Sequence, residues 1–487
     1  MLRKLKIVLF ENISLKQVLF KNSFWISVSE AFNKAIRAVL LIYLARVLGA
    51  AEYGKFSFAL SFISIFVSFL DLGLSSIITR EFSKEKVAKK EFSSLFTLKV
   101  FLGVSTFVLV FLTSFFITAD PGIRRVIWVL AVFSFITQFP ELLYAFWRAQ
   151  QRMEYEAWSN IFIVVTMVGF VFFVIFTRPS LENISYAYLL SGLFSVSLLF
   201  LIFSARFIPL RFNVEPADWM KFLSMSWPLA LTSISGVLYS YIDSIIMGYL
   251  KQMSQTGWYN ASLKIVYLLS GPASIITLNF LPILSKFSHE SRERFQNAWN
   301  YQMGIMIFLA APIVVVGSIL ADKIIQFFYG SAYYPSVMVL QILVFMSGLS
   351  FLSCPFGNAL VAANQQKKTF FISISGAATN IILNLILIPK YSLYGAAFSS
   401  VISYLVMLYF YFRATAVCTV IKPLNRHILW FVIAVIIAAA VMALLIVSPA
   451  VYNLNLILTV LAGICLYILT FFGAVRVIHA VTKIKVI

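Results

Sequence analysis

Charged residues are scarce in this sequence: they make up 11% of its 487 residues, whereas 61% are hydrophobic. Soluble globular domains carry about 25% charged residues, so this composition excludes a soluble enzyme or binding domain. Uncharged stretches such as 161–176 and 428–447 are long enough, with their flanks, to cross a bilayer. The chain is therefore expected to be an all-α polytopic membrane protein.

Cysteine and histidine are also rare, with three of each. The cysteines stand alone, without a C-x-x-C or Cys/His pairing, so no disulfide framework, metal site or cofactor is expected. The histidines all fall in predicted connectors or the tail, which excludes an intramembrane histidine proton relay. No P-loop pattern is present, so ATP hydrolysis by that route is not expected either.

Residues 1–22 lack a small-residue cleavage site, so no cleavable signal peptide is predicted. Apolar residues alternate there with basic ones, which predicts a basic amphipathic helix on the membrane surface. A disordered basic tail is the alternative.

Fourteen membrane spans are predicted at about 20 residues per crossing. The first six are expected at 24–48, 57–79, 94–117, 126–147, 156–177 and 184–207. The other eight are expected at 224–248, 259–283, 299–320, 334–360, 369–388, 393–415, 428–447 and 453–475. No connector is long enough to form a separate domain.

The basic residues predict the orientation of these spans. With a cytoplasmic N-terminus, 26 Lys and Arg residues fall on the cytoplasmic side and 7 on the external side. Because cytoplasmic connectors are enriched in basic residues, both termini are expected in the cytoplasm. The formal net charge of +20 thus reflects topology, and no nucleic-acid partner is expected.

An internal repeat is indicated by two short connectors. Residues 52–56, Glu-Tyr-Gly-Lys-Phe, join the first two spans, and residues 255–259, Gln-Thr-Gly-Trp-Tyr, join the seventh and eighth. Six spans separate them, so the two halves keep the same orientation. This predicts two lobes related by a pseudo-twofold axis along the membrane normal, with substrate bound between them.

Four sequence blocks resemble the polysaccharide-biosynthesis, or Wzx-like, flippases. The first runs from Leu44-Ala45-Arg46-Val47-Leu48-Gly49 through Tyr53-Gly54 to Asp71-Leu72-Gly73-Leu74. The others are residues 243–248 with 257–259, residues 328–330 with Tyr333, and residues 380–384 continuing through Pro389 to Gly395-Ala396-Ala397. The resemblance covers nearly the whole chain.

This resemblance implies the fold of the multidrug/oligosaccharidyl-lipid/polysaccharide exporter superfamily. The expected parts are a basic segment at 1–22, an N-lobe at 23–210, a C-lobe at 211–415, and a helix pair with a basic tail at 416–487. The implied activity is flipping of a polyprenyl-diphosphate-linked oligosaccharide from the cytoplasmic to the external leaflet of the cell membrane. Because the blocks concern packing and turns, they leave the glycan unspecified.

Polar residues inside the first two spans are the main site candidates, since a charge in hydrocarbon costs on the order of 3 kcal/mol and needs a cavity or a partner. One face of the first span carries Glu30, Asn33, Lys34 and Arg37. Asp71 lies on a serine stripe of the second span, at nearly the predicted depth of Lys34. A structural Lys34–Asp71 ion pair is the alternative to a substrate role.

The second lobe carries Asp243 and Lys264 at matching predicted depths near the external side. They form either an ion pair that closes a helical hairpin or an external gate. Glu141 and Lys99 lie near predicted cytoplasmic ends and are interpreted as interfacial. Asn380 and Asn384 are expected to bond across helices.

Alternating access is the expected mechanism. Lys34 and Arg37, with Asn33 and Lys264, would bind the diphosphate, because a guanidinium grips phosphate oxygens bidentately. Asp71, Asp243, Glu30 or Glu141 would couple transport to H⁺ or Na⁺ or act as gates. Membrane lipids and polysaccharide-assembly machinery are the other expected partners.

Two rival functions remain. A cation-coupled drug or small-metabolite exporter would share the fold but favour an acidic cavity, whereas the first span is basic. A membrane polymerase or glycosyltransferase would have a large external loop or a carboxylate-rich domain. Every connector here is short, so no catalytic residues are expected.

Overall fold

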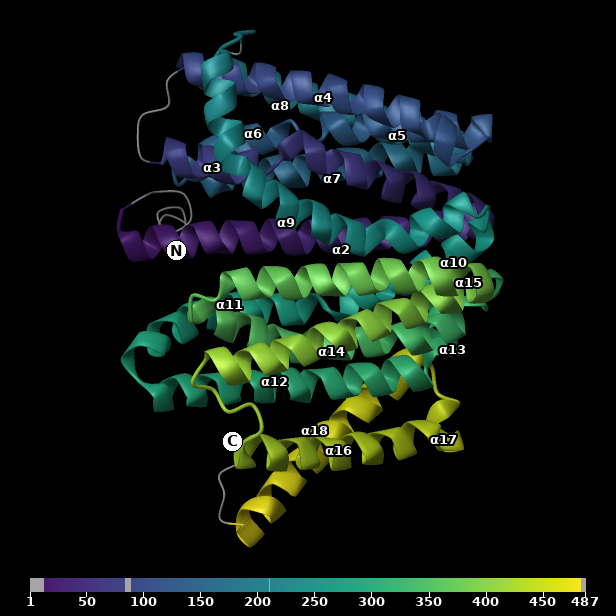
Figure 1. Ribbon diagram of the computed structural model, residues 1–487. Helices are drawn as coiled ribbons and strands as arrows, with labels where there is room; N and C mark the ends of the chain where they lie inside the picture. Colours follow the sequence, from purple (N-terminus) through teal and green to yellow (C-terminus); the bar gives the residue numbers. More distant parts are fainter. Residues whose placement is uncertain (1–12, 84–88, 210, 483–487) are drawn as a thin grey trace, which may run out of the picture. The chain divides into compact units, whose positions relative to one another are not determined.

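The computed structural model describes residues 13–83, 89–209 and 211–482, and in these residues all regular elements are helices (Figure 1). The chain divides into two compact units, Met1–Tyr249 and Leu250–Ile487. The first 12 residues of the predicted amphipathic segment lie outside the described residues, and residues 15–22 are part of the first helix rather than of a separate segment.

The first unit contains eight of the helices in Figure 1. They are α2 (Leu15–Asp71), α3 (Leu74–Phe82), α4 (Lys89–Ile117), α5 (Pro121–Ile136), α6 (Pro140–Ala149), α7 (Met153–Thr177), α8 (Leu181–Arg206) and α9 (Pro216–Tyr249). Helix α9 packs along α2 and also contacts α3 and α4. The compact unit therefore includes the seventh predicted span.

The second unit contains the remaining helices. They are α10 (Met253–Leu269), α11 (Gly271–Glu290), α12 (Arg292–Ile319), α13 (Ala321–Tyr329), η1 (Ser331–Tyr333), α14 (Ser336–Ala362), α15 (Gln366–Cys418), α16 (Arg426–Val447), α17 (Pro449–Tyr452) and α18 (Leu456–Thr482). Helices α16 and α18 pack together as the predicted C-terminal pair, and α16 also packs on α12.

The described helices can be divided into fourteen segments of membrane-spanning length. Among the described residues, eleven apolar helical stretches are long enough to span a membrane. Two of them, with 63 and 53 residues, are far longer than the about 20 residues of one crossing. The backbone of each is broken by a residue with positive φ, Gly49 (φ 73°) in α2 and Ser392 (φ 52°) in α15. Each of these two stretches is long enough for two crossings. Counting both of them twice and adding α9 raises the eleven stretches to the fourteen spans predicted from the sequence.

Three predicted spans are each divided into two helices. The span at 57–79 is interrupted at Leu72 and Gly73, which both have positive φ. The span at 126–147 is divided between α5 and α6, and Pro140 begins α6. The span at 259–283 is divided at Ser270, just before Gly271 and a proline. Proline lacks a backbone N–H and favours the first turn of a helix, so these breaks follow the local sequence.

Two connectors, one in each unit, share the same turn geometry. Gln151 follows α6 and Asn364 follows α14, and both adopt positive φ. In the first turn Arg152 N donates to Trp147 O at 2.9 Å, and in the second Gln365 N donates to Leu360 O at 2.8 Å. This is the 6→1 bond of a Schellman helix end. The recurrence supports the internal repeat predicted from other connectors.

An aromatic core holds the first unit together. Phe92 of α4 lies 5.6 Å from Phe146 of α6 and 5.5 Å from Phe203 of α8, measured between ring centroids. Trp147 packs on Phe203 at 5.8 Å. Offset and edge-to-face packing of this kind fixes the orientation of α4, α6 and α8. Helices α4 and α6 carry the charged residues Lys99, Glu141 and Arg148, which are described below.

Candidate functional site

The cationic face of the first span lies on α2 and is not covered by protein. Lys34 Nζ lies 3.3 Å from Glu30 Oε2, one turn away on the same helix, and the two side chains are 71% and 56% exposed. Exposed pairs of this spacing contribute only a few tenths of a kcal/mol, about 0.3–0.5. Lys34 therefore remains accessible to another anion.

Arg37 lies one turn further along the same face. Its side chain is exposed, and no carboxylate of the described residues lies within ion-pair distance of it. Asn33, one turn before it, has a buried Oδ1 for which the described residues offer no hydrogen-bond partner. Helix α2 thus presents two cations and an amide near the middle of a membrane-spanning segment.

Asp71 pairs with Lys99 of α4, so the predicted Lys34–Asp71 pair is wrong. Lys99 Nζ lies 3.1 Å from Asp71 Oδ1, and the Ser75 hydroxyl also donates to that oxygen. Lys99, interpreted from the sequence as interfacial, is only 1% exposed. The second half of α2 begins directly after Gly49, so at about 1.5 Å per residue Asp71 lies roughly 10 Å beyond the level of Lys34.

Arg148 of α6 joins two carboxylates. Its Nε donates to Glu156 Oε2 at 2.8 Å and its Nη2 donates to Glu156 Oε1, which is a bidentate pair. Its Nη1 lies 3.7 Å from Glu141 Oε2. Glu141 also interacts electrostatically with Lys99 and Asp71. We call these five residues the ionic cluster of the first unit, in which three carboxylates face two cations.

Lys21 provides another buried charge that sequence reasoning missed. It belongs to the segment predicted to lie on the membrane surface, yet it is 0% exposed and lies 3.0 Å from Glu154. Its Nζ also donates to Gln151 O at 3.2 Å, and the Asn22 amide donates to Gln151 Oε1 at 2.7 Å. These bonds tie the start of α2 to the turn between α6 and α7, a contact that no local sequence pattern indicates.

The other predicted site residues lie in separate helices. Asp243 is buried in α9 of the first unit, and Lys264 lies in α10 of the second, 5.9 Å from the ring centroid of Tyr267. Their pairing stays a prediction. Asn384 Nδ2 donates to Asn380 Oδ1 at 2.9 Å, so this bond runs along one helix rather than across helices. Asn380 Nδ2 is buried without a partner among the described residues.

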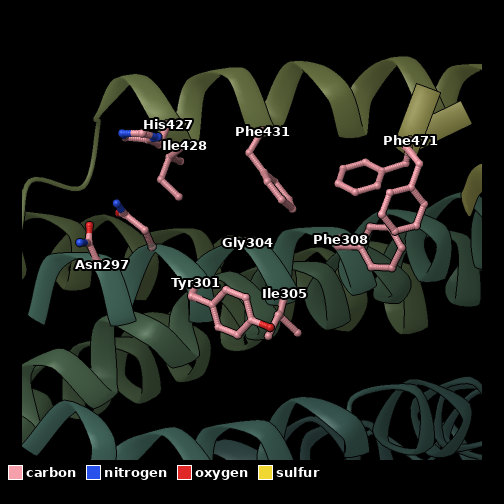
Figure 2. A pocket seen from close by; sticks show the side chains of 11 residues that line it. Asn297, Tyr301, Gly304, Ile305, Phe308, His427, Ile428, Phe431 and Phe471 are labelled. Atoms are coloured by element: carbon pink, nitrogen blue, oxygen red, sulfur yellow. The ribbon is translucent and has the colours of Figure 1, made fainter. Parts of the chain in front are cut away.

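A cavity of about 310 Å³ lies in the second unit, between α12, α16 and α18 (Figure 2). Asn297 and His427 lie at one end of it, and Phe308 and Phe471 lie at the other. No sequence motif indicated this cavity, because its lining residues are distant in the chain.

A family profile described as "Polysaccharide biosynthesis protein" matches residues 19–288, more than half of the chain, and a profile described as "MatE" matches residues 228–386. The chain is 23% identical to the capsular polysaccharide biosynthesis protein CapF of Staphylococcus aureus, over 80% of this chain and 98% of that protein. It is 21% identical to "Probable low-salt glycan biosynthesis flippase Agl15" of Haloferax volcanii, over 80% and 81% of the two chains.

Solved structures share the fold. The lipid II flippase MurJ, in an inward closed conformation, superposes with a TM-score of 0.74 and 15% identity over 93% of this chain and 98% of that chain. An inward-facing multidrug resistance MATE family transporter superposes with a TM-score of 0.62 and 13% identity, over 79% and 95% of the two chains. The chain belongs to the polysaccharide biosynthesis protein family and has the fold of the multidrug/oligosaccharidyl-lipid/polysaccharide exporter superfamily.

Proposed function

We propose that this protein is a flippase that moves a polyprenyl-diphosphate-linked oligosaccharide from the cytoplasmic to the external leaflet of the cell membrane by alternating access. Membership of the polysaccharide biosynthesis family supports this proposal, as does similarity to a protein named a glycan biosynthesis flippase. The product would enter assembly of a cell-surface polysaccharide. The protein would act without catalytic residues, because the reaction is translocation.

Arg37 is the observation that carries the proposal. A guanidinium near the middle of a spanning helix costs on the order of 3 kcal/mol unless it meets an anion or water. Among the described residues no carboxylate pairs with Arg37, so its exposed guanidinium is accessible to an anionic ligand. A diphosphate fits, since its oxygens match the fork of donors on a guanidinium, with Lys34 and Asn33 beside it. Lys264 of α10 stays a predicted substrate-binding residue.

The carboxylates would couple or gate the movement. In the ionic cluster, Asp71 and Glu141 share two cations with Glu156, so uptake of one H⁺ or Na⁺ would balance the charge. Asp243 and Glu30 are the other candidates. Both termini would lie in the cytoplasm, as the basic connectors require.

Translocation in proteoliposomes tests the proposal. Purified protein is reconstituted with a fluorescent polyprenyl-diphosphate oligosaccharide, and exposure of the glycan on the far leaflet is followed with a membrane-impermeant reagent. Arg37→Gln should slow the initial rate of translocation about 10- to 100-fold. This is the effect expected from losing one charge-assisted hydrogen bond to the headgroup, which is worth about 1.5–3 kcal/mol. Arg178→Gln, in the exposed connector between α7 and α8, is the matched control and should transport at the parent rate.

A drug or small-metabolite exporter is the second candidate function, favoured by the match of residues 228–386 to the MatE profile. It is tested in the same vesicles with a cationic dye. Dye export without glycan translocation would replace the flippase proposal. Equal glycan translocation by the parent and Arg37→Gln would keep the flippase activity and reject Arg37 as the headgroup site. Chain elongation of the glycan would instead indicate a polymerase or glycosyltransferase.

A further inference from the structure

The cavity between α12, α16 and α18 is polar at one end and apolar along the rest of its length (Figure 2). Asn297, Asn300 and His427 lie at the polar end, and Phe308, Phe431 and Phe471 line the remainder. Positions 297 and 308 on α12 are about 16 Å apart at about 1.5 Å per residue. The volume of about 310 Å³ falls at the lower end of the range of small-molecule sites, about 300–1,000 Å³.

The ring of Phe431 lies against Gly304 in this cavity. A Cβ added to Gly304 would lie 3.3 Å from Cε2 and 3.4 Å from Cζ of Phe431. Any larger side chain at this position would therefore extend into the volume between α12 and α16. Figure 2 shows Gly304 midway between the polar end at His427 and the rings of Phe308 and Phe471.

A second cavity of about 350 Å³ adjoins the first at its polar end. It lies between α11 and α12, and it shares Asn297 and Tyr301 with the first cavity. Arg294 lines it, with a side chain that is 68% exposed and only 3.7 Å from Glu290 at its nearest. Arg294, with its ion-pair partner Glu290, thus lies one turn from Asn297.

The lining suits an amphipathic occupant, and the neighbouring Arg294 suits one with an anionic headgroup. The apolar part is formed by three membrane-spanning helices, and the phenylalanine rings in its lining suit an acyl chain. The amide of Asn297 and the guanidinium of Arg294 are donors for a phosphate. Basic pockets between spanning helices bind anionic lipid headgroups for this reason.

We propose that this cavity binds a bilayer phospholipid with an anionic headgroup. One acyl chain occupies the apolar part, and the phosphate lies at Asn297, His427 and Arg294. The cavity is built within one unit and ends at the rings of Phe308 and Phe471, which are 4.8 Å apart between centroids. The occupant we propose is a lipid of the bilayer and not the transported substrate.

Photocrosslinking tests this site in proteoliposomes of the full chain. Phosphatidylglycerol with a diazirine in one acyl chain is photolysed at trace amounts in a phosphatidylcholine bilayer, and crosslinked peptides are identified by mass spectrometry. Peptides of α12, α16 and α18 should carry the label at least fivefold more than when the same probe has a phosphatidylcholine headgroup. Gly304→Leu should reduce this label at least fivefold, because the added side chain fills the cavity.

Two further variants separate the headgroup site from the chain site. Gly169→Leu is the matched control, since a Cβ on that glycine meets nothing within 4 Å, and its label should equal that of the parent. Arg294→Gln should remove the preference for phosphatidylglycerol, whereas Arg292→Gln, outside the cavity on the same helix, should keep it. Gly304→Ala gives an intermediate loss and replaces Gly304→Leu if the latter elutes as aggregate.

Three outcomes would overturn the proposal. Equal labelling of the parent and both Gly304 variants would show that the cavity holds no acyl chain. Equal labelling by the two headgroups would show that the site does not select an anion. Displacement of the label by excess polyprenyl phosphate but not by excess phosphatidylglycerol would assign the cavity to the carrier lipid.

Discussion

At the scale of single residues, the Asp71–Lys99 pair is the charge interaction that the structure buries most deeply in the ionic cluster. Removing one partner of a buried pair costs about 3–5 kcal/mol, because the other charge is left uncompensated. Asp71→Asn leaves the ammonium of Lys99, which is 1% exposed, without its carboxylate. We expect a loss of about 3 kcal/mol of unfolding free energy.

The double variant Asp71→Asn/Lys99→Met should recover most of that loss, since replacing both members of a buried pair is often nearly neutral. The stability of the single and the double variant is measured by thermal unfolding in detergent, with tryptophan fluorescence as the signal. Glu215→Gln breaks the exposed pair with Lys90 and should leave the melting temperature unchanged. If the double variant is no more stable than Asp71→Asn, the two side chains do not form the pair described.

The sequence identified the polar residues correctly but paired them incorrectly. Lys34, Arg37 and Asp71 were identified from the sequence because charged side chains are rare in membrane spans, where they are costly to bury. Their partners depend on where a helix bends and resumes: α2 bends at Gly49 and continues as helix directly after it, whereas the next span was predicted to begin only at residue 57. The burial of Lys21 depends on a contact between α2 and a turn about 130 positions later, which no periodicity encodes.

At the scale of the elements, the bend in α15 depends on a glycine. A Cβ on Gly395 would overlap Leu387 O and would lie 2.6 Å from the carbonyl carbon, both backbone atoms on the other side of Ser392. The backbone on the two sides of the bend therefore approaches too closely for a side chain. Gly395→Ala should cost about 1–3 kcal/mol by overpacking, because backbone atoms cannot move aside as a flexible side chain can.

Detergent melting temperature and folded yield by size exclusion measure this effect. Gly376→Ala is an informative comparison, since its Cβ would meet the side chain of Met407, which can change rotamer. Gly169→Ala, in the interior of α7 with nothing within 4 Å of the added Cβ, should stabilise the protein by up to about 1 kcal/mol. A Gly395→Ala variant as stable as Gly169→Ala would show that the bend opens without cost.

The C-terminal helix pair is held by a bond outside the membrane-spanning segments. The Tyr452 hydroxyl donates to Asp322 Oδ2 at 2.7 Å, and Lys323 Nζ donates to Tyr452 O and lies 4.3 Å from the ring centroid. The bond to Asp322 is the main reason that the pKa of Tyr452 is raised to about 12. Tyr452→Phe should cost about 1–2 kcal/mol at pH 8.

The pH dependence follows from the raised pKa. The ordinary tyrosine pKa is about 10, so the unfolded chain loses this proton before the folded chain does. The stabilisation is complete below pH 10 and declines as pH rises towards 12. The melting difference between the parent and Tyr452→Phe should therefore be smaller at pH 11 than at pH 8. Tyr334→Phe, at an exposed tyrosine of the same unit, should show no difference at either pH.

Helix positions were predictable where apolar runs are long and uninterrupted. The last two spans, expected at 428–447 and 453–475, correspond to α16 and α18. The helix breaks at Gly73, Pro140 and Gly271 were not predicted, because the apolar sequence runs on without interruption on both sides of each break. Glycine and proline at these positions were the available signal. They interrupt helices without ending a membrane crossing.

At the scale of the whole molecule, hydropathy predicted a polytopic helical membrane protein and a resemblance predicted the family, both of which are confirmed, with eleven candidate spans among the described residues. The lining of the cavity between α12, α16 and α18 was not predictable. Its residues come from segments more than a hundred positions apart, and their grouping depends on how the C-terminal pair packs on α12.

The orientation of the molecule gives the last prediction. Basic connectors resist export, since each positive charge moved outward against a potential of 100 mV costs about 2.3 kcal/mol. Single cysteines placed at Arg178 and Lys390, on a background with the three native cysteines replaced, should react with an impermeant maleimide in intact cells. Cysteines at Arg292 and Lys422 should react only after permeabilisation. All four positions are exposed in the structure, so lack of reaction reports sidedness rather than burial. A reversed pattern would place both termini outside, and a mixed pattern within the second unit would reject the fourteen crossings, because Lys390 and Lys422 are separated by one predicted span.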